Sequence, residues 1–346
     1  MCYFVGYPAH KRFKKIALIL EFIIPLTIIA FIASYAFLPQ SYRYKKPELI
    51  TITRGNSLKE ITYKLYDKKL INNPYLFYFI GFISGYSRYI EAGTYYVSAS
   101  ESPASIYHKF VNGNVASAKI TIPPGLNIFQ IAEILAKKKI TGRKRFLKEC
   151  FDKRFLLSLK INKKTAEGFL YPDTYIFKIH SNPQNIIKEM VNEFNLKTKN
   201  LKLGYNDLII ASMIIKEADG NYKNSMKLIS SVIHNRLKIN MPLDIDSTSI
   251  YGKNLLSYKK YIKKKDKFKI DLNMNLSYLK IKSPYNTYLK YGLPPSPIAN
   301  PNIRAIKAAV NPKKTRYLYY MSTKTGKTIF ARTLISQNEN INKYLK

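Results

Sequence analysis

The feature that most constrains this chain is an apolar run of 23 residues from Ile16 to Leu38 that holds one charged residue, Glu21. As a helix the run would be roughly 34 Å long, which is enough to cross the hydrocarbon core of a bilayer. Basic residues flank it on both sides, with a slight excess before it that favours a cytoplasmic N-terminus. We therefore expect a basic cytoplasmic segment at residues 1–15, a transmembrane helix at 16–38, and the remainder of the chain across the membrane.

A cleaved signal peptide is the alternative interpretation, because Ser34-Tyr35-Ala36 loosely matches a cleavage site. The run is longer than the apolar part of a normal signal peptide, which favours an uncleaved anchor. Cys2 precedes the run and so cannot be a lipoprotein cysteine. Glu21 is costly inside a membrane, and it either reaches back to the cytoplasmic interface or contacts another membrane helix.

The charge of the chain is strongly positive, with 58 Lys and Arg against 21 Asp and Glu, a net charge of +37. Such a charge is typical of nucleic-acid binding. Two observations weaken that interpretation: the region after residue 38 is expected outside the cytoplasm, and the cations are overwhelmingly Lys. Compositional drift accounts for the excess, and attraction to anionic headgroups or acidic wall polymers is the functional alternative. We expect no nucleic-acid partner.

The remaining composition predicts a folded protein without a metal site. With 346 residues and 46% hydrophobic residues, the chain has room for two or three modest domains. Cys2 and Cys150 lie on opposite sides of the apolar run, so we expect no disulfide between them and a core thiol at Cys150. None of the 4 His belongs to a cluster with metal-ligand spacing, so neither a metal nor another cofactor is expected.

Two segments after the apolar run are related to each other. Residues 52–65 and 122–135 share the same pattern of apolar residues and glycine, and a second matching pair of segments follows each of them. Each copy has the pattern of a strand, a glycine turn and an amphipathic helix. We predict two related α+β units at 48–113 and 118–198, with an insertion near 144–164 in the second.

A carboxylate ends an apolar helix in the second half of the chain. The run Leu208–Ile215 predicts a mostly buried helix that begins near Asn206 or Asp207, and Glu217 lies at its end. Apolar surroundings and the negative end of the helix dipole both raise the pKa of a carboxyl, whereas Lys216 would lower it. A carboxylic acid that stays protonated near neutral pH is suited to general-acid catalysis. A solvated surface glutamate is the alternative.

The residues around Glu217 form five blocks that resemble the endolytic murein transglycosylase family, the YceG-like proteins. In chain order the blocks are Lys216-Glu217, Asn235-Arg236-Leu237, Asp246 with Tyr251-Gly252, Ser283-Pro284-Tyr285-Asn286-Thr287-Tyr288, and Gly292-Leu293-Pro294-Pro295-Ser296-Pro297. A further block, Glu167–Tyr175, also matches the family, and the unit at 48–113 resembles its LysM-like module, a fold that docks on N-acetylglucosamine glycans.

The resemblance implies a fold and a reaction. The fold is α+β, with one N-terminal transmembrane helix, LysM-like modules, and a mixed α+β catalytic domain at 199–346 that follows the unit at 118–198. The reaction cleaves the bond between N-acetylmuramic acid and N-acetylglucosamine in nascent peptidoglycan, leaves 1,6-anhydromuramic ends and terminates strand elongation. Glu217 would be the catalytic acid. The implied substrate-binding residues are Asn235, Arg236, Asp246, Tyr251, Tyr285, Asn286 and Thr287.

Arg236 ends a predicted helix at 224–239, where it could hold a carboxylate bidentately, either Asp246 or a substrate acid, or lie on the surface. A water-using glycosidase would need a second carboxylate, for which Asp219, Asp244 and Asp246 are candidates. The chain also departs from the family pattern at several positions. These are Ser247 in place of proline, Thr328 and Gln337 in place of histidine, and Pro123-Pro124-Gly125 in place of Pro-Glu-Gly. The Lys-rich segment 253–282 looks longer than the corresponding segment of the family. It is either a solvated insertion whose sequence has drifted or a basic lid.

The implied partners are peptidoglycan strands, the inner membrane and wall synthases of the penicillin-binding class. The implied location is the inner membrane, with a single span and a periplasmic catalytic domain. Two rival hypotheses remain: a catalytically silent peptidoglycan-binding scaffold of the same fold, and a basic nucleic-acid or headgroup binder. The first predicts a solvated, replaceable Glu217, and the second predicts binding that salt abolishes.

Overall fold

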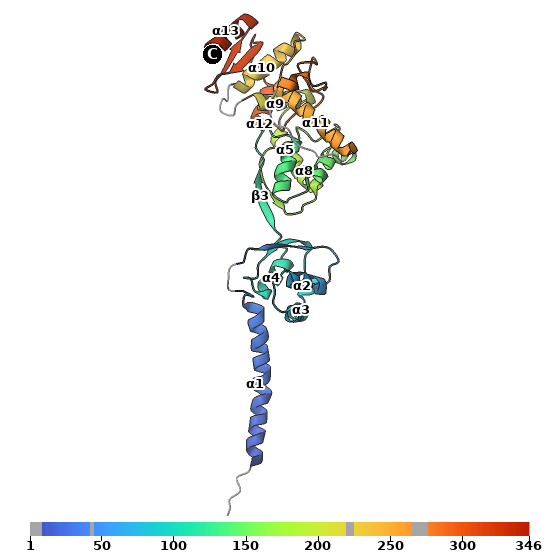
Figure 1. Ribbon diagram of the computed structural model, residues 1–346, viewed down its shortest axis with the longest axis vertical. Helices are drawn as coiled ribbons and strands as arrows, with labels where there is room; N and C mark the ends of the chain where they lie inside the picture. The colour runs from blue at the N-terminus through green and yellow to red at the C-terminus, as the bar shows by residue number, and fades with distance from the viewer. Residues whose placement is uncertain (1–8, 42–44, 219–224, 265–275, 346) are drawn as a thin grey trace, which may run out of the picture. The chain divides into compact units, whose positions relative to one another are not determined.

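The computed structural model describes residues 9–41, 45–218, 225–264 and 276–345. The chain divides into two compact units, unit 1 (Met1–Ser117) and unit 2 (Ala118–Lys346), and each is described by itself (Figure 1). Helices and short two-stranded sheets occur in both units, so the predicted mixed α+β class is confirmed.

Unit 1 consists of one long helix followed by a small α+β body. Its elements are α1 (Ala9–Phe37), β1 (Glu48–Ile52), α2 (Leu58–Asp67), α3 (Pro74–Ile83), the short 3-10 helix η1 (Tyr86–Arg88), β2 (Gly93–Val97) and α4 (Pro103–Val111). Strands β1 and β2 pair antiparallel, with Ile50 opposite Tyr95. Beneath them the stacked rings of Phe77 and Tyr107, 4.3 Å apart, lie in a core of buried apolar side chains.

The end of α1 packs against this body. The Tyr35 hydroxyl donates to the Asn73 carbonyl over 2.6 Å, and Ala36 is buried in the unit 1 core. Gln40 receives hydrogen bonds from the backbone and the side chain of Asn72. Among the residues described, no helix combines the length and the hydropathy needed to cross a bilayer. The membrane-spanning segment therefore stays a prediction.

Unit 2 begins with the same order of elements as the body of unit 1. The series is β3 (Ser117–Thr121), α5 (Ile128–Lys137), α6 (Arg143–Cys150), α7 (Lys153–Ser158), β4 (Thr174–Lys178) and α8 (Pro183–Thr198). Both series open with a strand, a left-handed glycine (Gly55 or Gly125) and a helix with a capping box at Ser57 or Asn127. The extra residues of the second series lie between α6 and β4.

The rest of unit 2 carries helices around α9 and a C-terminal hairpin. The elements are α9 (Tyr205–Glu217), α10 (Ser225–Lys238), α11 (Asp246–Lys264), the 3-10 helix η2 (Leu276–Lys280), α12 (Ile303–Val310), β5 (Tyr319–Ser322), β6 (Thr328–Ala331) and α13 (Leu334–Tyr344). Helix α9 contacts α10, α11 and α12, and its residues Leu208–Ile214 are all buried. The predicted buried helix is therefore confirmed, with Glu217 as its last residue.

The proline-rich loop before α12 is fastened to both parts of unit 2 by Asn300. The buried Asn300 side chain accepts hydrogen bonds from the backbone of Gly168 and Leu170 and donates to Glu167 and to the carbonyl of Leu126. The same loop reaches α9 through Ser212, whose hydroxyl accepts from the Ile298 backbone over 3.0 Å. These contacts hold the helix that ends in Glu217.

Gly168→Ala should destabilise unit 2 for two reasons. The residue has φ +90°, and a Cβ would lie 2.6 Å from the Pro297 ring. The left-handed backbone costs about 1–2 kcal/mol, and the overpacked contact adds about 1–3 kcal/mol. Gly292→Ala is the matched control, because Gly292 has φ +84° with no atom within 4 Å. Urea unfolding followed by circular dichroism should show the larger loss for Gly168→Ala, and equal losses would contradict the packing argument.

Candidate active site

The Glu217 carboxyl lies where the end of α9 meets the start of α11 and strand β5. It is partly buried and accepts two hydrogen bonds. The Tyr320 hydroxyl donates to Oε2 over 3.0 Å, and the Ser247 hydroxyl donates to Oε1 over 3.4 Å. The side chain is therefore held by protein groups, in contrast to the solvated surface glutamate of the alternative interpretation.

Burial is the main reason that the pKa of Glu217 is raised above its ordinary value. The negative charge of Asp246 adds to the increase, whereas the Tyr320 and Ser247 hydroxyls and the Lys216 charge lower the pKa and offset part of it. The net result is a raised pKa, which is the direction predicted from the apolar helix. Lys216 itself is exposed and is the smallest of these contributions.

Asp246 is the second carboxylate of this site, and it is the first residue of α11. Its Oδ1 accepts a hydrogen bond from the Tyr288 hydroxyl over 2.5 Å. Burial raises the pKa of Tyr288, and the contact with Asp246 raises it further, so the phenol stays a donor. The carboxylate thus remains partly buried with one protein donor, beside the acid whose pKa it raises.

Asn286 and Thr287 fix the start of α11 through hydrogen bonds. Thr287 accepts a hydrogen bond from the Ile245 backbone and shares one with the Thr248 hydroxyl. Asn286 accepts from Ser249 and donates to two backbone carbonyls of residues 279–281. Both side chains are almost fully buried. Their polar atoms bind other protein groups, and they position Asp246 and Ser247. Their direct contact with sugars stays a prediction.

Asn235 and Arg236 hold the strand that carries Tyr320. The Asn235 amide donates to the carbonyls of Thr315 and Tyr317, and the Arg236 guanidinium donates to the carbonyl of Leu318. The bidentate pair with Asp246 is a wrong prediction, because the buried guanidinium bonds Asp244 at 3.2 Å and two further carbonyls, those of residues 242 and 243. These two predicted substrate contacts thus act as supports for β5.

Tyr251 and Tyr285 are buried, and their predicted contact with substrate stays a prediction. Their ring centroids lie 5.0 Å apart, and the Tyr285 hydroxyl shares a hydrogen bond of 2.7 Å with Ser296. The Tyr251 ring also contacts Phe129, and its hydroxyl lies near the fully buried Glu167. Both tyrosines pack α11 against the core of unit 2.

Sequence reasoning did not assign Tyr320, Tyr288 or Ser247 to the site. Tyr288 closes a block that resembles the family, so the resemblance offered a signal for it. Ser247 was noticed only as a departure from the family pattern. Tyr320 is one of 29 tyrosines and had no local signal. Of the two positions where the family has histidine, Gln337 donates to the backbone carbonyl of Tyr320 over 3.3 Å.

Several residues that the sequence analysis singled out lie outside the site or outside the described residues. Asp219 lies outside the described residues. Asp244 is exposed and paired with Arg236, which makes it a poor second carboxylate for Glu217. Thr328 lies in β6 opposite Ser322. In the segment 253–282, predicted as an insertion or a lid, residues up to 264 continue α11 and residues 276–280 form η2. Residues 265–275 of that segment lie outside the described part.

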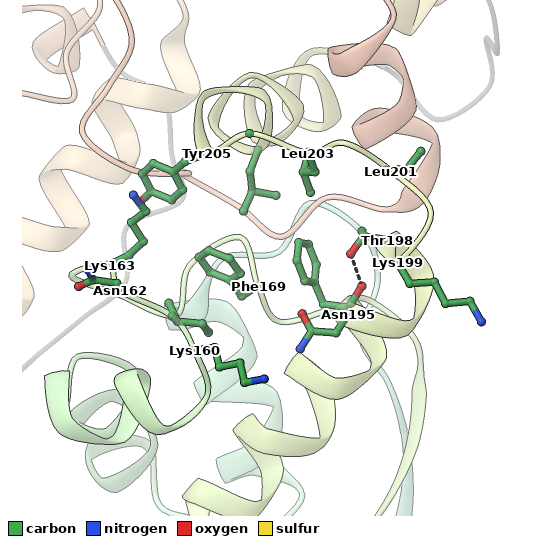
Figure 2. Close-up of a pocket in the computed structure, with 14 residues that line it drawn as sticks. Lys160, Asn162, Lys163, Phe169, Asn195, Thr198, Lys199, Leu201, Leu203 and Tyr205 are labelled. Carbon is green, nitrogen blue, oxygen red and sulfur yellow. Dashed lines mark hydrogen bonds between the residues drawn. The ribbon is translucent and has the colours of Figure 1, made fainter.

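Figure 2 shows a pocket beside the start of α9. Its volume is about 470 Å³. Its lining includes Phe169, Tyr205 and Lys163, whose ammonium lies 4.1 Å from the centre of the Tyr205 ring. The lining residue of α9 nearest to Glu217 is Leu208, nine residues before it, so the two are separated by roughly 14 Å along the helix axis. The hollow is therefore separate from the acid.

In chemical terms the site offers one protonatable acid, one further carboxylate and two phenols. Across the described ranges, no cluster of three or more His, Cys, Asp or Glu side chains has an arrangement that could hold a metal ion. Cys150 is a buried free thiol, as predicted. The arrangement is of the kind that transfers a proton to and from a substrate oxygen.

The chain belongs to the YceG-like family, whose model matches residues 50–343. It is similar to the endolytic murein transglycosylase of Bacillus subtilis, with 30% identity over 319 residues that cover 86% of this chain and 84% of that protein. It is 28% identical to the endolytic murein transglycosylase of Streptococcus pneumoniae over 343 residues, 88% of this chain and 60% of that protein.

Among solved structures, a yceG-like protein from Listeria monocytogenes has 32% sequence identity and a TM-score of 0.55. The similarity covers 86% of this chain and 99% of that one. The family resemblance drawn from the sequence blocks is therefore confirmed.

Glu167 gives the stability of unit 2 a dependence on pH. Burial raises its pKa to about 8, although hydrogen bonds from Ile128, Asn300 and the Gly168 backbone offset part of the increase. An unfolded glutamate has a pKa of about 4.3. Between these values the folded state holds a proton that the unfolded state has lost, so the free energy of unfolding falls as pH rises from about 5 to 8.

We expect Glu167→Gln to remove this dependence, because glutamine keeps the neutral shape and does not titrate. Urea unfolding at pH 5 and pH 9 should show a wild-type loss that exceeds the variant's by more than about 1 kcal/mol, since one pKa unit corresponds to about 1.4 kcal/mol. Glu339→Gln is the control at an exposed carboxyl of the same unit. Parallel losses in wild type and Glu167→Gln would contradict a protonated Glu167.

Proposed function

We propose that this chain is an endolytic murein transglycosylase that cuts glycan strands between N-acetylmuramic acid and N-acetylglucosamine. The observation that carries the proposal is the Glu217 carboxyl, partly buried, bonded by Tyr320 and raised in pKa. The similarity to two proteins of that name over most of this chain supports the substrate class. The established family membership and the chemistry of the site thus point to the same reaction.

In the proposed reaction Glu217 acts first as acid and then as base. Its proton passes to the glycosidic oxygen while the bond from that oxygen to C1 of the muramoyl ring breaks. The resulting carboxylate takes the proton of the C6 hydroxyl, whose oxygen closes onto C1. The acid is thereby restored, no water is consumed, and the product carries a 1,6-anhydro ring. A raised pKa suits the first step, and a nearby donor suits the second.

Asp246 and Tyr320 stabilise the charges that develop during bond cleavage. An oxocarbenium-like transition state carries positive charge, which the Asp246 carboxylate stabilises electrostatically. Tyr320 stabilises the Glu217 carboxylate after proton transfer, because its hydroxyl already points at Oε2. Asn235 and Arg236 support this function through β5, and Asn286 and Thr287 support it through α11.

We further propose an inner-membrane protein whose α1 spans the bilayer and whose catalytic part lies in the periplasm. The apolar run at 16–38 supports this, as do the exposed apolar side chains that α1 presents along its described part, such as Phe22, Leu26 and Phe31. The LysM-like role of unit 1 is supported by its strand, left-handed Gly55 and capped helix. Penicillin-binding wall synthases are the proposed protein partners.

A silent scaffold of the same fold is the rival proposal. It rests on the two positions, Thr328 and Gln337, where the family usually has histidine. Gln337 touches the backbone of Tyr320 rather than Glu217 itself, so this departure leaves the acid and its donors in place. We therefore favour the enzyme.

The decisive experiment incubates the full chain and its Glu217→Gln variant with purified peptidoglycan and identifies the released ends by mass spectrometry. Wild type should give 1,6-anhydromuramoyl ends. The variant should be about 10²–10⁴-fold slower, which is the usual contribution of a positioned general acid. Glu339→Gln is the matched control and should keep full activity, because that carboxyl is exposed on α13.

Other products would redirect the assignment. Reducing ends would indicate a water-using hydrolase, in which Asp246 would have to act as the second carboxylate. Intact glycan binding without any products would favour the scaffold.

The pH dependence of the rate should move in opposite directions in two variants. Asp246→Asn removes a charge that raises the pKa of Glu217, so its alkaline limb should move to lower pH. Tyr320→Phe removes a hydrogen bond that lowers this pKa, so its limb should move to higher pH. Shifts of up to about one pH unit are expected. Initial rates of anhydro-end release across pH measure both, and shifts of the same sign would contradict the assignment of Glu217.

A further inference from the structure

Helix α3 of unit 1 is apolar on all sides, although the body it belongs to covers only one of them. Its sequence, Pro74–Ile83, contains no charged residue. Phe77, Ile80 and Gly81 face the unit 1 core. The opposite face is formed by residues at the helical spacing i, i+3, i+4, i+7 and i+8, all of them exposed aromatic or aliphatic side chains. These are Tyr75, Tyr78, Phe79, Phe82 and Ile83.

The exposure of this face is large for side chains of this kind. Tyr75 is 76% exposed, Phe82 66% and Ile83 59%. Next to them Lys59 and three tyrosines of α2 and α3 line a hollow of about 330 Å³. A helix that is hydrophobic on all sides is usually buried in protein or in a membrane, and a contiguous exposed apolar patch marks an interaction surface. We call the five residues of the exposed side the α3 face.

The position of α3 in unit 1 identifies what covers this face. Helix α3 packs against α1 and lies at the side of the body from which α1 leaves (Figure 1). The backbone carbonyl of its capping residue Asn73 accepts a hydrogen bond from the Tyr35 hydroxyl. Asn72 donates two hydrogen bonds to Gln40, just beyond the end of α1. The attachment is too short and too well bonded to let the body swing away. Where α1 leaves the bilayer, α3 is at the bilayer surface.

We propose that the α3 face lies in the interfacial layer of the membrane and forms a second lipid contact beside α1. Tyrosine is enriched at this depth because its ring is apolar and its hydroxyl is polar, and Tyr75 and Tyr78 fit that role. Lys59, which lines the hollow together with Tyr75 and Tyr78, suits contact with anionic headgroups. The inference rests on the proposed membrane anchor and adds an orientation of unit 1 to it.

The test uses tryptophan as a depth probe, since the natural chain contains 0 Trp. The full chain is reconstituted into phosphatidylethanolamine–phosphatidylglycerol vesicles with a spin label high or low on the acyl chain. Phe82→Trp reports the α3 face, and Ile28→Trp reports the middle of the proposed span. Ile335→Trp, at an exposed residue of α13 in unit 2, controls for exposed apolar positions in general.

We expect the emission of Phe82→Trp to be blue-shifted and quenched more strongly by the shallow label than by the deep one. Ile28→Trp should show the reverse order, and Ile335→Trp should resist both labels. Quenching of Ile28→Trp with Phe82→Trp unaffected would overturn the inference while the anchor stands. If neither probe is quenched, the anchor fails and the α3 face fails with it. A blue shift of Phe82→Trp that grows with protein density and ignores both labels would show that a second copy covers the face, which also overturns the inference.

Discussion

The buried amide of Asn300 is the contact on which unit 2 depends. It donates two hydrogen bonds and accepts two, which is the full capacity of a primary amide. Its partners lie near residues 126 and 168, far from it in the sequence. A buried polar group that loses its partner costs about 1–3 kcal/mol. Moving any one of the three segments would therefore leave buried polar groups without partners and destabilise unit 2. The loop that carries Asn300 also packs along α9, and the position of Glu217 follows from that packing.

A held helix end allows the site to balance opposing effects on one carboxyl. Burial and Asp246 favour the protonated form of Glu217, and Tyr320 and Ser247 favour the carboxylate. A proton donor that must later accept a proton benefits from both, provided that neither side dominates. The balance depends on distances near 3 Å, which explains why polar side chains such as Asn235 and Thr287 are used to fix strand β5 and the start of α11. Most of the predicted substrate contacts belong to this supporting layer.

Local sequence patterns predicted the helices and the motifs, but they did not predict the contacts that depend on packing between distant segments. Helical periodicity was sufficient for α9, and the internal repeat was sufficient for the strand, glycine turn and helix that open both series. The motif blocks identified the family and predicted Glu217 as the acid. They did not separate side chains that face substrate from those that hold loops, because Asn286 and Asp246 look equally polar in a sequence. Tyr320 reaches Glu217 from 103 residues away through a strand fixed by Arg236, and no local pattern carries that contact.

Sequence alone is also insufficient for an all-apolar helix of unit 1. Its composition fits either a helix buried in a protein core or a helix with one face on a membrane. Pro74–Ile83 has the composition of a core helix, and a core position would need protein on every side. The body covers one side of the helix, where Tyr107 of α4 stacks on Phe77 of the helix itself. Apolar area left in water costs roughly 25 cal/mol per Å², so five large side chains on one face are expensive unless something covers them. Since Asn72 and Asn73 fasten this helix to the end of α1, a lipid surface reached by α1 is also within reach of the face.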